Sequence, residues 1–429
     1  MRTYQTVTVN NTNQYKKQLL GWAQQFREVV FFDSNNYQQL YTSYDTVLAV
    51  DAFTSVKTDF HNSFDELKIY QQTTKDWIFG YLSYDLKNDT EDLKSDNFDG
   101  LQFPDLFFFQ PKKIFLLKGN QLEIQYLNLC DDEIEDDLKT IAGYCKQETV
   151  KGQPLYIKQR ISKESYLKKA KDMLGHIHRG DIYEANFCME FYAENSGIDP
   201  FETYASLNAI SEPPFAVFFK NYKQYLLSAS PERYIRKEGT KIISQPIKGT
   251  ARRSDTVDED KTIQKELSLN EKERSENIMI VDLVRNDLSR TATKGSVNVE
   301  ELCGAYAFKQ VHHLISTVIS EIEDSTSPVD VIRTTFPMGS MTGAPKISAM
   351  QIIEKLEETK RGLYSGAVGY FTPQGDFDFN VVIRSILYNE ANNYVSFSVG
   401  SAITSKAIPE QEYEECLLKA RAMRSVLEN

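Results

Sequence analysis

Cysteine and histidine are both scarce in this sequence, and neither is spaced as a disulfide framework or a zinc site would require. Each occurs five times in 429 residues, with no Cys-x-x-Cys pair and no His-Glu-x-x-His motif. We therefore expect reduced thiols in a reducing compartment. His176 and His178 lie in a lysine-rich helical stretch, where a surface position is expected rather than a metal site.

Long apolar runs and an excess of basic residues are missing too. No run approaches the about 18 apolar residues of a membrane-spanning helix, and the first residues lack the apolar core of a signal peptide. Acidic residues outnumber basic ones, 61 to 49, for a net charge of -12. Nucleic acids and anionic membranes attract basic surfaces, so we expect neither as a partner, and we expect a cytoplasmic protein.

The composition is otherwise that of a globular protein, with 41% hydrophobic and 26% charged residues. The length allows two or three domains of about 150 residues each, or one larger intertwined unit. An acidic segment at residues 131–137 leads to the best candidate boundary, at residues 151–154. We predict a β-rich N-terminal region over residues 1–150, either separate from or intertwined with the rest, and a second domain over residues 151–429.

Hydrophobic periodicity predicts strands along the whole chain and helices mainly in its second part. Strands are expected at residues 29–32, 46–50, 77–82, 106–109, 114–117, 122–126, 225–229, 241–244, 311–319, 366–371, 381–388 and 394–399. Gly119 and Asn120 suit the turn of a hairpin. Helices are expected at residues 13–25, 162–178, 201–209, 258–267, 345–356 and 410–427.

Two helical segments carry paired glutamates three residues apart, and therefore on one face: Glu273 with Glu276, and Glu412 with Glu415. Carboxylates held so close repel unless they share a cation, and oxygen ligands from two facing helices suit Mg²⁺. The alternative is a solvated face, which such pairs usually form in an acidic protein. Lys419 suits either a surface ion pair with Glu415 or a clamp on a bound carboxylate.

Two segments rich in small residues could hold a bound anion. Residues 337–346 form a Gly-rich turn before a predicted helix, where main-chain amides could cradle a carboxylate, although a plain connector is the alternative. Residues 399–403 would let a ligand approach the backbone at a strand end. Arg384, on the neighbouring strand, could bind a second carboxylate. Taken alone, that arginine is more often a structural ion-pair partner.

A lysine, Lys248, stands between Pro-Ile and Gly-Thr in the stretch 245–253, just before two arginines. Desolvation and cationic neighbours would favour its neutral amine, so it is a candidate nucleophile, and a basic surface loop is the alternative. Glu232 precedes it by 16 positions, along a predicted hairpin that could bring this acid beside the lysine. Strand alternation turns either His312 or His313 inward, where a satisfied core histidine is the default.

In this order, these segments resemble the chorismate-utilising enzymes over about residues 155–427. The resemblance is carried by Ser-Pro-Glu-Arg at 230–233, Pro-Ile-Lys-Gly-Thr at 246–250, the run 273–287, His-Leu at 313–314, Gly-Ala-Pro-Lys at 343–346, residues 369–384, and the acid pair at 412–415. It implies an α+β fold in which two large antiparallel sheets pack face to face with helices outside. The second predicted domain would be the chorismate-binding catalytic domain.

Within the family, the lysine segment is similar to component I of aminodeoxychorismate synthases, because anthranilate synthases and isochorismate-forming members have alanine in place of Lys248. This implies Mg²⁺-dependent amination of chorismate to 4-amino-4-deoxychorismate, in the para-aminobenzoate branch of folate biosynthesis. Lys248 would attack C2 and expel the C4 hydroxyl, ammonia would then enter at C4, and Glu232 would act as general acid and base. The alternatives are an anthranilate synthase component I and a catalytically silent homologue.

The resemblance also implies a set of site residues. The catalytic residues would be Lys248, Glu232 and His313. The substrate-binding residues would be Gly249, Thr250, Ser340, Thr342, Gly343, Tyr364, Arg384, Gly400, Ser401, Ala402 and Lys419. The Mg²⁺ ligands would be Glu273, Glu276, Glu412 and Glu415.

Several positions depart from the family pattern. Glu184 stands where related synthases commonly have glutamine and isochorismate synthases have a basic lysine, which disfavours isochorismate formation. Ser401 replaces a commoner glycine. Residues 31–34 differ from the tryptophan site of anthranilate synthases, so we expect no feedback inhibition by tryptophan. The chain lacks the Gly-x-Cys-x-Gly elbow of a glutaminase, so ammonia is expected from solution or from a separate glutamine amidotransferase subunit.

Overall fold

The structure, a computed structural model, describes residues 1–37, 40–145 and 154–429. Its strands are β1 (Arg2–Thr8), β2 (Glu28–Asp33), β3 (Thr46–Thr58), β4 (Ile78–Leu82), β5 (Leu106–Lys118), β6 (Gln121–Leu127), β7 (Lys158–Gln159), β8 (Glu184–Ala193), β9 (Phe215–Asn221), β10 (Gln224–Ser230), β11 (Arg233–Glu238), β12 (Lys241–Gln245), β13 (Ile247–Arg252), β14 (Asn298–Ala307), β15 (Val311–Glu321), β16 (Gly343–Ala344), β17 (Ala367–Phe371), β18 (Phe377–Val381), β19 (Ser385–Asn389) and β20 (Tyr394–Thr404). Its helices are α1 (Thr12–Ala23), α2 (Ser63–Thr74), α3 (Lys87–Thr90), α4 (Ile134–Ala142), α5 (Lys163–Arg179), α6 (Pro200–Ser211), α7 (Val257–Leu269), α8 (Glu271–Ser289), α9 (Pro328–Thr335), α10 (Lys346–Leu356) and α11 (Pro409–Glu428).

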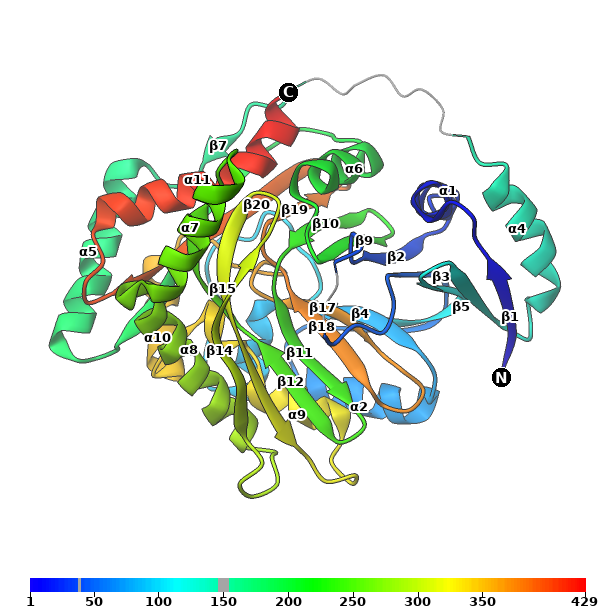
Figure 1. The fold of residues 1–429 in the computed structure, drawn as a ribbon, viewed down its shortest axis with the longest axis horizontal. Coiled ribbons are helices and arrows are strands. Elements are labelled where there is room, and N and C mark those ends of the chain that lie inside the picture. Colours follow the sequence, from blue (N-terminus) through cyan, green and yellow to red (C-terminus); the bar gives the residue numbers. More distant parts are fainter. Residues whose placement is uncertain (38–39, 146–153) are drawn as a thin grey trace.

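The named strands pair antiparallel throughout the described residues, and the pairings join all 20 of them into one continuous network. Helices cover the outside: α5, α7, α8, α10 and α11 gather on one side of Figure 1, and α1 and α4 lie on the other. The expected α+β fold, antiparallel with external helices, is confirmed.

Strands from the two ends of the chain share sheets. β2 pairs with β9, and β4 pairs with β17. Residue 150, where the two predicted domains would meet, lies outside the described residues, so the division there stays a prediction. The buried apolar side chains form two large cores, one against α1, α5, α6, α10 and α11 and the other against α2, α8 and α9.

The start of each glutamate-bearing helix is fixed by local chemistry. Asn270 caps α8, and its side chain accepts hydrogen bonds from the main-chain N–H groups of Lys272 and Glu273. Pro409 occupies the first turn of α11, together with Glu412. Acidic residues in a first turn are favoured by the helix dipole. Both helices therefore present carboxylates at their N-terminal ends, where α8 packs on β13 and β15 and α11 packs on β20.

Most of the expected helices and strands are present within a few residues of the predicted bounds. The strands expected at residues 106–109 and 114–117 form one continuous strand, β5, and β3 continues to Thr58, beyond its expected end at residue 50. The hairpin of β5 and β6 turns at Gly119, whose φ is 57°. The strand expected over residues 381–388 is broken between β18 and β19, and Arg384 there has a φ of 52°. Non-glycine residues rarely adopt this left-handed region, and the break turns the chain at the residue that lines the cavity described below.

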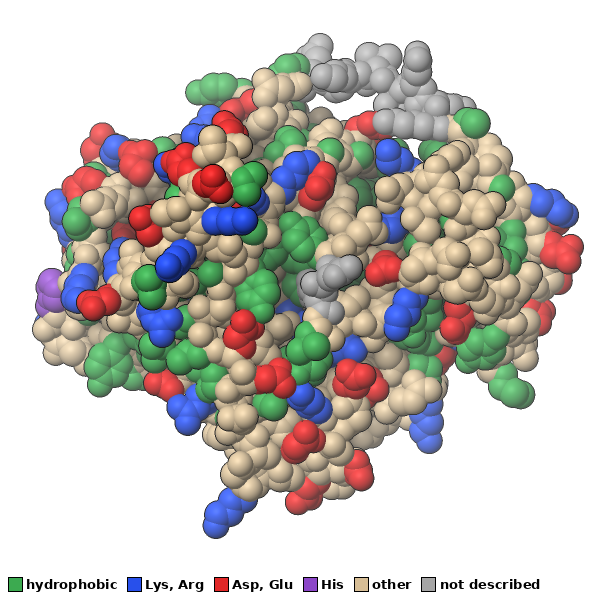
Figure 2. All heavy atoms as spheres, viewed as in Figure 1, with side chains coloured by type: hydrophobic (Ala, Val, Ile, Leu, Met, Phe, Trp, Pro, Cys, Tyr) green, Lys and Arg blue, Asp and Glu red, His purple; other side chains and the backbone are tan. Residues whose placement is uncertain are grey.

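Both histidines of β15 are buried, rather than one of them. His312 is 0% and His313 is 4% exposed. The strand is covered on both faces, because His312 Nε2 lies 2.8 Å from Asp260 on α7 while His313 faces the cavity. No helix in the described part of the chain is long and apolar enough to span a membrane. On the face drawn in Figure 2, acidic and basic side chains are interspersed.

Candidate active site

Most of the predicted site residues surround one cavity of about 650 Å³, a size typical of sites for small molecules. The cavity is lined by residues of β13, β15 and β20, by the N-terminal part of α8, and by much of the length of α11. The predicted residues that line it are Glu232, Lys248, Gly249, Thr250, Glu273, Glu276, His313, Ser340, Tyr364, Arg384, Gly400, Ala402, Glu412, Glu415 and Lys419.

Two residues of the Gly-rich turn do not line the cavity. The hydroxyl of Thr342 is directed into its own turn, 3.3 Å from Gly339 O, and the side chain is buried. Gly343 pairs with β8 so closely that a Cβ atom would lie 2.2 Å from Glu184 O. The amides of Met341 and Thr342 donate within the turn. These parts of the predicted anion cradle therefore hold the turn together, and Ser340 and Met341 are the residues of the turn that line the cavity.

Ser401 also lies outside the cavity lining. Its side chain is fully buried, and its hydroxyl oxygen is 3.0 Å from the hydroxyl oxygen of Tyr166 on α5. Its neighbours Gly400 and Ala402 face the cavity instead. The serine found where a glycine is commoner in the family thus packs behind the site, in keeping with the alternation of side chains along β20.

Lys248 reaches the cavity from β13 and meets a carboxylate. Its Nζ donates to Glu184 Oε1 on β8 at 3.1 Å, and the two side chains are 15% and 2% exposed. Burial acts to lower the pKa of this lysine, but the charges of Glu184, Glu276 and Glu415 outweigh it, so the pKa is raised. The surroundings of the Lys248 amine are therefore acidic, in place of the cationic neighbours considered from the sequence.

The two arginines downstream of Lys248 point away from it. Arg252 pairs with Glu259 at 2.8 Å, and Arg253 pairs with Asp260 at 2.7 Å. Both partners lie on α7, so the arginines attach that helix to the sheet and contribute no positive charge beside the lysine amine.

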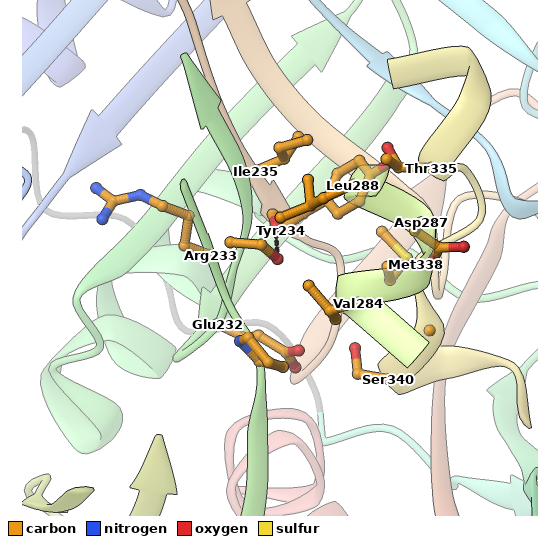
Figure 3. A pocket seen from close by; sticks show the side chains of 13 residues that line it. Glu232, Arg233, Tyr234, Ile235, Val284, Asp287, Leu288, Thr335, Met338 and Ser340 are labelled. Carbon is orange, nitrogen blue, oxygen red and sulfur yellow. Dashed lines mark hydrogen bonds between the residues drawn. The ribbon is translucent and has the colours of Figure 1, made fainter. Parts of the chain in front are cut away.

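Glu232 is buried next to Ser340. Burial raises the pKa of Glu232 to about 7, although the Ser340 hydroxyl, the Ile247 main-chain N–H and the Lys248 charge each lower it. A second cavity of about 20 Å³ adjoins the carboxyl, and Figure 3 shows Glu232 there close to Ser340 and Val284. An acid with this pKa is present in both protonated and ionised forms at neutral pH, so it can donate a proton to a leaving group.

His313 is held as a neutral ring. Burial, together with the nearby charge of Arg384, lowers its pKa to about 3. Its Nδ1 lies 3.2 Å from Gly249 O and 3.1 Å from Thr250 Oγ1. Since a carbonyl only accepts, Nδ1 carries the proton, which leaves Nε2 with a free lone pair. The histidine predicted as catalytic can therefore accept a hydrogen bond at neutral pH.

Two cationic side chains, Arg384 and Lys419, also line the cavity. No ion pair or hydrogen bond of the Arg384 guanidinium is seen among residues 1–37, 40–145 and 154–429, so it has its donors available for an anion. Lys419 donates to Gly400 O at 2.8 Å and pairs with Glu415 at 2.5 Å. An arginine in a cavity without an acidic partner is the group that a carboxylate would bind.

The four glutamates lie along the rim of the same cavity, on α8 and α11. Burial and the charge of Glu273 raise the pKa of Glu276 to about 7, against the lowering effect of Lys248. Burial and the charge of Glu415 raise the pKa of Glu412. These shifts are what uncompensated, neighbouring carboxylates produce. The donor set, all oxygen and rich in charge, fits Mg²⁺.

The glutamates are not drawn together into a cluster. In the described part of the chain, no three acidic, histidine or cysteine side chains are close enough to hold a metal ion. Lys272 lies 3.9 Å from Glu276, and Lys419 pairs with Glu415. The positive charges of these lysines therefore partly neutralise the glutamates, as a bound divalent cation would.

One residue that was not predicted fastens the site together. Asn277, on α8 beside Glu276, is 1% exposed. Its amide donates to Lys248 O at 3.1 Å and to Leu314 O at 3.3 Å, and its oxygen accepts from Ser316 at 2.5 Å. Its position next to the acid pair was visible in the sequence, but no local pattern indicated that it joins α8 to β13 and β15.

The sequence matches the family described as chorismate binding enzymes over residues 27–425. That span includes every residue lining the cavity. The chain therefore belongs to the chorismate-binding enzyme family.

Relatives with different stated activities are similarly close. The chain is 32% identical over 361 residues to aminodeoxychorismate synthase component 1 of Bacillus subtilis, covering 81% of this chain and 76% of the relative. It is 33% identical over 365 residues to anthranilate synthase component 1 of Thermus thermophilus, covering 82% and 77%. The crystal structure of anthranilate synthase component I from Streptococcus pneumoniae superposes with a TM-score of 0.79 at 24% identity, over 91% of this chain and 94% of that one. That likeness establishes the fold.

Proposed function

We propose that this chain is component I of an aminodeoxychorismate synthase, which aminates chorismate to 4-amino-4-deoxychorismate for para-aminobenzoate and folate biosynthesis. Relatives named for this activity and for anthranilate synthesis are 32% and 33% identical, so overall similarity does not choose between them. The observation that carries the choice is Lys248, whose amine faces the cavity beside Glu232. A lysine there can form a covalent intermediate, which the alanine of the other family members cannot.

Chorismate carries two carboxylates, and the cavity offers a place for each. The guanidinium of Arg384, which has no ion pair within the described residues, and the backbone at Gly400, which carries no side chain, suit one carboxylate. The glutamate rim, with Mg²⁺, suits the other. The substrate ring would then lie across the cavity between Lys248 and Glu232, with the neutral His313 as an acceptor for a substrate hydroxyl.

The proposed reaction has two displacements. The neutral amine of Lys248 attacks C2, both ring double bonds shift, and the C4 hydroxyl leaves as water with the proton of Glu232. Ammonia then attacks C4, the two double bonds shift back, and the lysine leaves as a neutral amine. The ionised Glu232 takes a proton from the new ammonium group, so the overall change is chorismate plus ammonia to aminodeoxychorismate plus water. The raised pKa of Glu232, about 7, suits both proton transfers.

Mg²⁺ would be held by Glu273, Glu276, Glu412 and Glu415, which line the cavity from α8 and α11. When bound, it would neutralise the charge of the substrate carboxylate as the ring electrons move. The lysines that pair with these glutamates would then be released toward solvent or substrate. Of these, Lys419 keeps its hydrogen bond to Gly400 O as a second anchor.

Ammonia is proposed to come from a separate glutamine amidotransferase subunit, with ammonium in solution as the substitute in vitro. The sequence contains no Gly-x-Cys-x-Gly elbow, and the related chain of Bacillus subtilis is named as a component 1. A cytoplasmic location suits this substrate supply.

The product identifies the activity. Purified protein is incubated with chorismate, Mg²⁺ and ammonium, and the products are separated before and after addition of an aminodeoxychorismate lyase. We expect para-aminobenzoate only after the lyase is added. Anthranilate formed directly would identify an anthranilate synthase instead, and unchanged chorismate in every mixture would identify a silent homologue.

A further inference from the structure

Arg361 and Glu357 form a buried, two-pronged ion pair close to the cavity but outside its lining. Arg361 Nε donates to Glu357 Oε2 at 3.0 Å, and Arg361 Nη2 donates to Glu357 Oε1 at 2.8 Å. The residues are 5% and 7% exposed. Removal of two charges from water is costly, and mutual attraction alone seldom compensates for it. The other hydrogen bonds of the pair therefore show what it holds.

Those hydrogen bonds go to two segments that the chain brings together from far apart. Arg361 Nη1 donates to Met341 O at 2.5 Å, and Nη2 donates to Asn186 O at 2.7 Å. Glu357 Oε1 accepts from the main-chain N–H of Cys188 at 2.9 Å. One planar guanidinium thus joins the turn before β16 to the start of β8, and Glu357 fixes the guanidinium against the same strand.

Both segments carry side chains of the active site. Asn186 and Ser340 line the cavity, and Asn186 Nδ2 donates to Ser340 O at 3.2 Å. The side chain of Ser340 in turn lies close to that of Glu232, and both line the smaller cavity. The contacts therefore form a chain from the buried pair through Met341 and Asn186 to the acid.

We propose that Arg361, oriented by Glu357, is a positioning residue that holds Ser340 against the carboxyl of Glu232 and thereby sets the strength of that acid. Arg361 touches neither the cavity nor any reacting atom, so it acts through the turn that it fastens. The inference rests on the proposed function only where it takes Glu232 as the general acid of the reaction.

The test compares two arginine-to-lysine changes at residues that each contact β8. Arg361→Lys keeps the positive charge but loses the planar fork. Arg160→Lys is the matched control, because Arg160 Nε pairs with Glu190 Oε2 at 3.0 Å near the far end of β8 and does not line the cavity. For both variants and the unmodified protein we would measure urea unfolding, kcat and KM for chorismate, and the titration of Glu232 by NMR of carboxyl-labelled glutamate, assigned with Glu232→Gln.

Movement of the Ser340 hydroxyl away from the ionised carboxyl should raise the titration midpoint of Glu232 by about half to one pH unit in Arg361→Lys. Displacement of the acid should also lower kcat by about 10- to 100-fold, with a smaller change in KM. Arg160→Lys should change neither quantity by more than about twofold or shift the midpoint. Equal activity and equal midpoints in the two lysine variants would overturn the proposal.

A double substitution separates positioning from general weakening of the fold. If Arg361 acts through Ser340, Arg361→Lys should shift the Glu232 midpoint no further in a Ser340→Ala background. If the shifts in the Glu232 titration midpoint caused by Arg361→Lys and Ser340→Ala were additive, the proposal that Arg361 acts through Ser340 would be overturned. If Arg361→Lys does not fold, Glu357→Gln supplies the same comparison, because it keeps an acceptor for Cys188 and weakens only the pair. The NMR midpoint needs no turnover, so a different product would refute the proposed function and leave this inference still testable.

Discussion

Lys248 and Glu184 form an ion pair, 3.1 Å between Nζ and Oε1, in which the carboxylate is almost wholly excluded from solvent. Glu184 Oε2 is buried without a hydrogen-bond partner among the described atoms. Glu276 and Glu415 add negative charge around the same amine. The lysine proposed as nucleophile is therefore charged before substrate and metal arrive, and it must lose a proton to react.

Replacement of Glu184 by glutamine should make Lys248 reactive at lower pH. An opposite charge within a few ångströms raises a lysine pKa, so its removal should lower the pKa by about one unit or more. The rate of covalent adduct formation with chorismate and Mg²⁺, followed by intact mass across pH 6 to 10, should rise at a correspondingly lower pH. Glu194→Gln, on an exposed side chain just beyond β8, is the control. An unshifted pH profile would show that Glu184 does not set the charge of the lysine.

Lys248→Ala should abolish the adduct and the amination of chorismate. The variant keeps the cavity and its glutamates but has no amine to attack C2. Lys272→Ala is a suitable comparison, because Lys272 also lines the cavity and lies 3.9 Å from Glu276. The adduct should persist in that variant. Aminodeoxychorismate formation at the normal rate by Lys248→Ala would exclude the nucleophile role.

Glu232 should make the folded protein less stable as the pH rises. Its folded pKa of about 7 exceeds the ordinary value of 4.5, so the folded state binds this proton more tightly and the advantage is lost between these pH values. The difference corresponds to about 3 kcal/mol in the free energy of unfolding. Urea unfolding without added metal, at pH 5 and pH 8, should show a smaller loss in Glu232→Gln than in the unmodified protein. Equal losses would mean that the carboxyl is not desolvated.

Those parts of the fold that depend on short stretches of the sequence could be predicted. Helices such as α5 and α11 were visible from apolar periodicity, and the hairpin of β5 and β6 from its turn residues. The pairing of β2 with β9 and of β4 with β17 was not, because it joins segments far apart in the chain. The break at Arg384 was missed because its neighbours favour a continuous strand.

The sequence indicated which residues line the cavity better than it indicated the charges of those residues. Motif residues came together because the fold arranges the elements that carry them around the same cavity. The charge of Lys248 could not be predicted, since its partner Glu184 is 64 residues away in sequence and Arg252 pairs with Glu259 on α7. A pKa depends on which groups the fold brings close, and neighbours in sequence do not report this.

Removal of a rim glutamate should raise the concentration of Mg²⁺ needed for activity. Glu415→Gln removes one charged oxygen ligand from the proposed set. The affinity of the protein for Mg²⁺ should therefore fall by at least about tenfold. Glu414→Gln is the matched control, because Glu414 is the preceding residue of α11 and pairs with Lys163 on the surface at 3.1 Å. Activity would be titrated with Mg²⁺ for both variants. Superimposable curves would show that Glu415 is not a ligand.

Tryptophan should not inhibit the enzyme. The cavity beside β2 where residues 31–34 lie measures about 60 Å³, room for about four water molecules. Arg233 and Asp378 line it and form an ion pair with each other, and Arg236 pairs with the same carboxylate. Binding of an amino acid with an indole ring would have to break these buried pairs, which is costly when a charge is left without a partner. Millimolar tryptophan should therefore change neither the rate of product formation nor the melting temperature, and strong inhibition would mean that this cavity opens in solution.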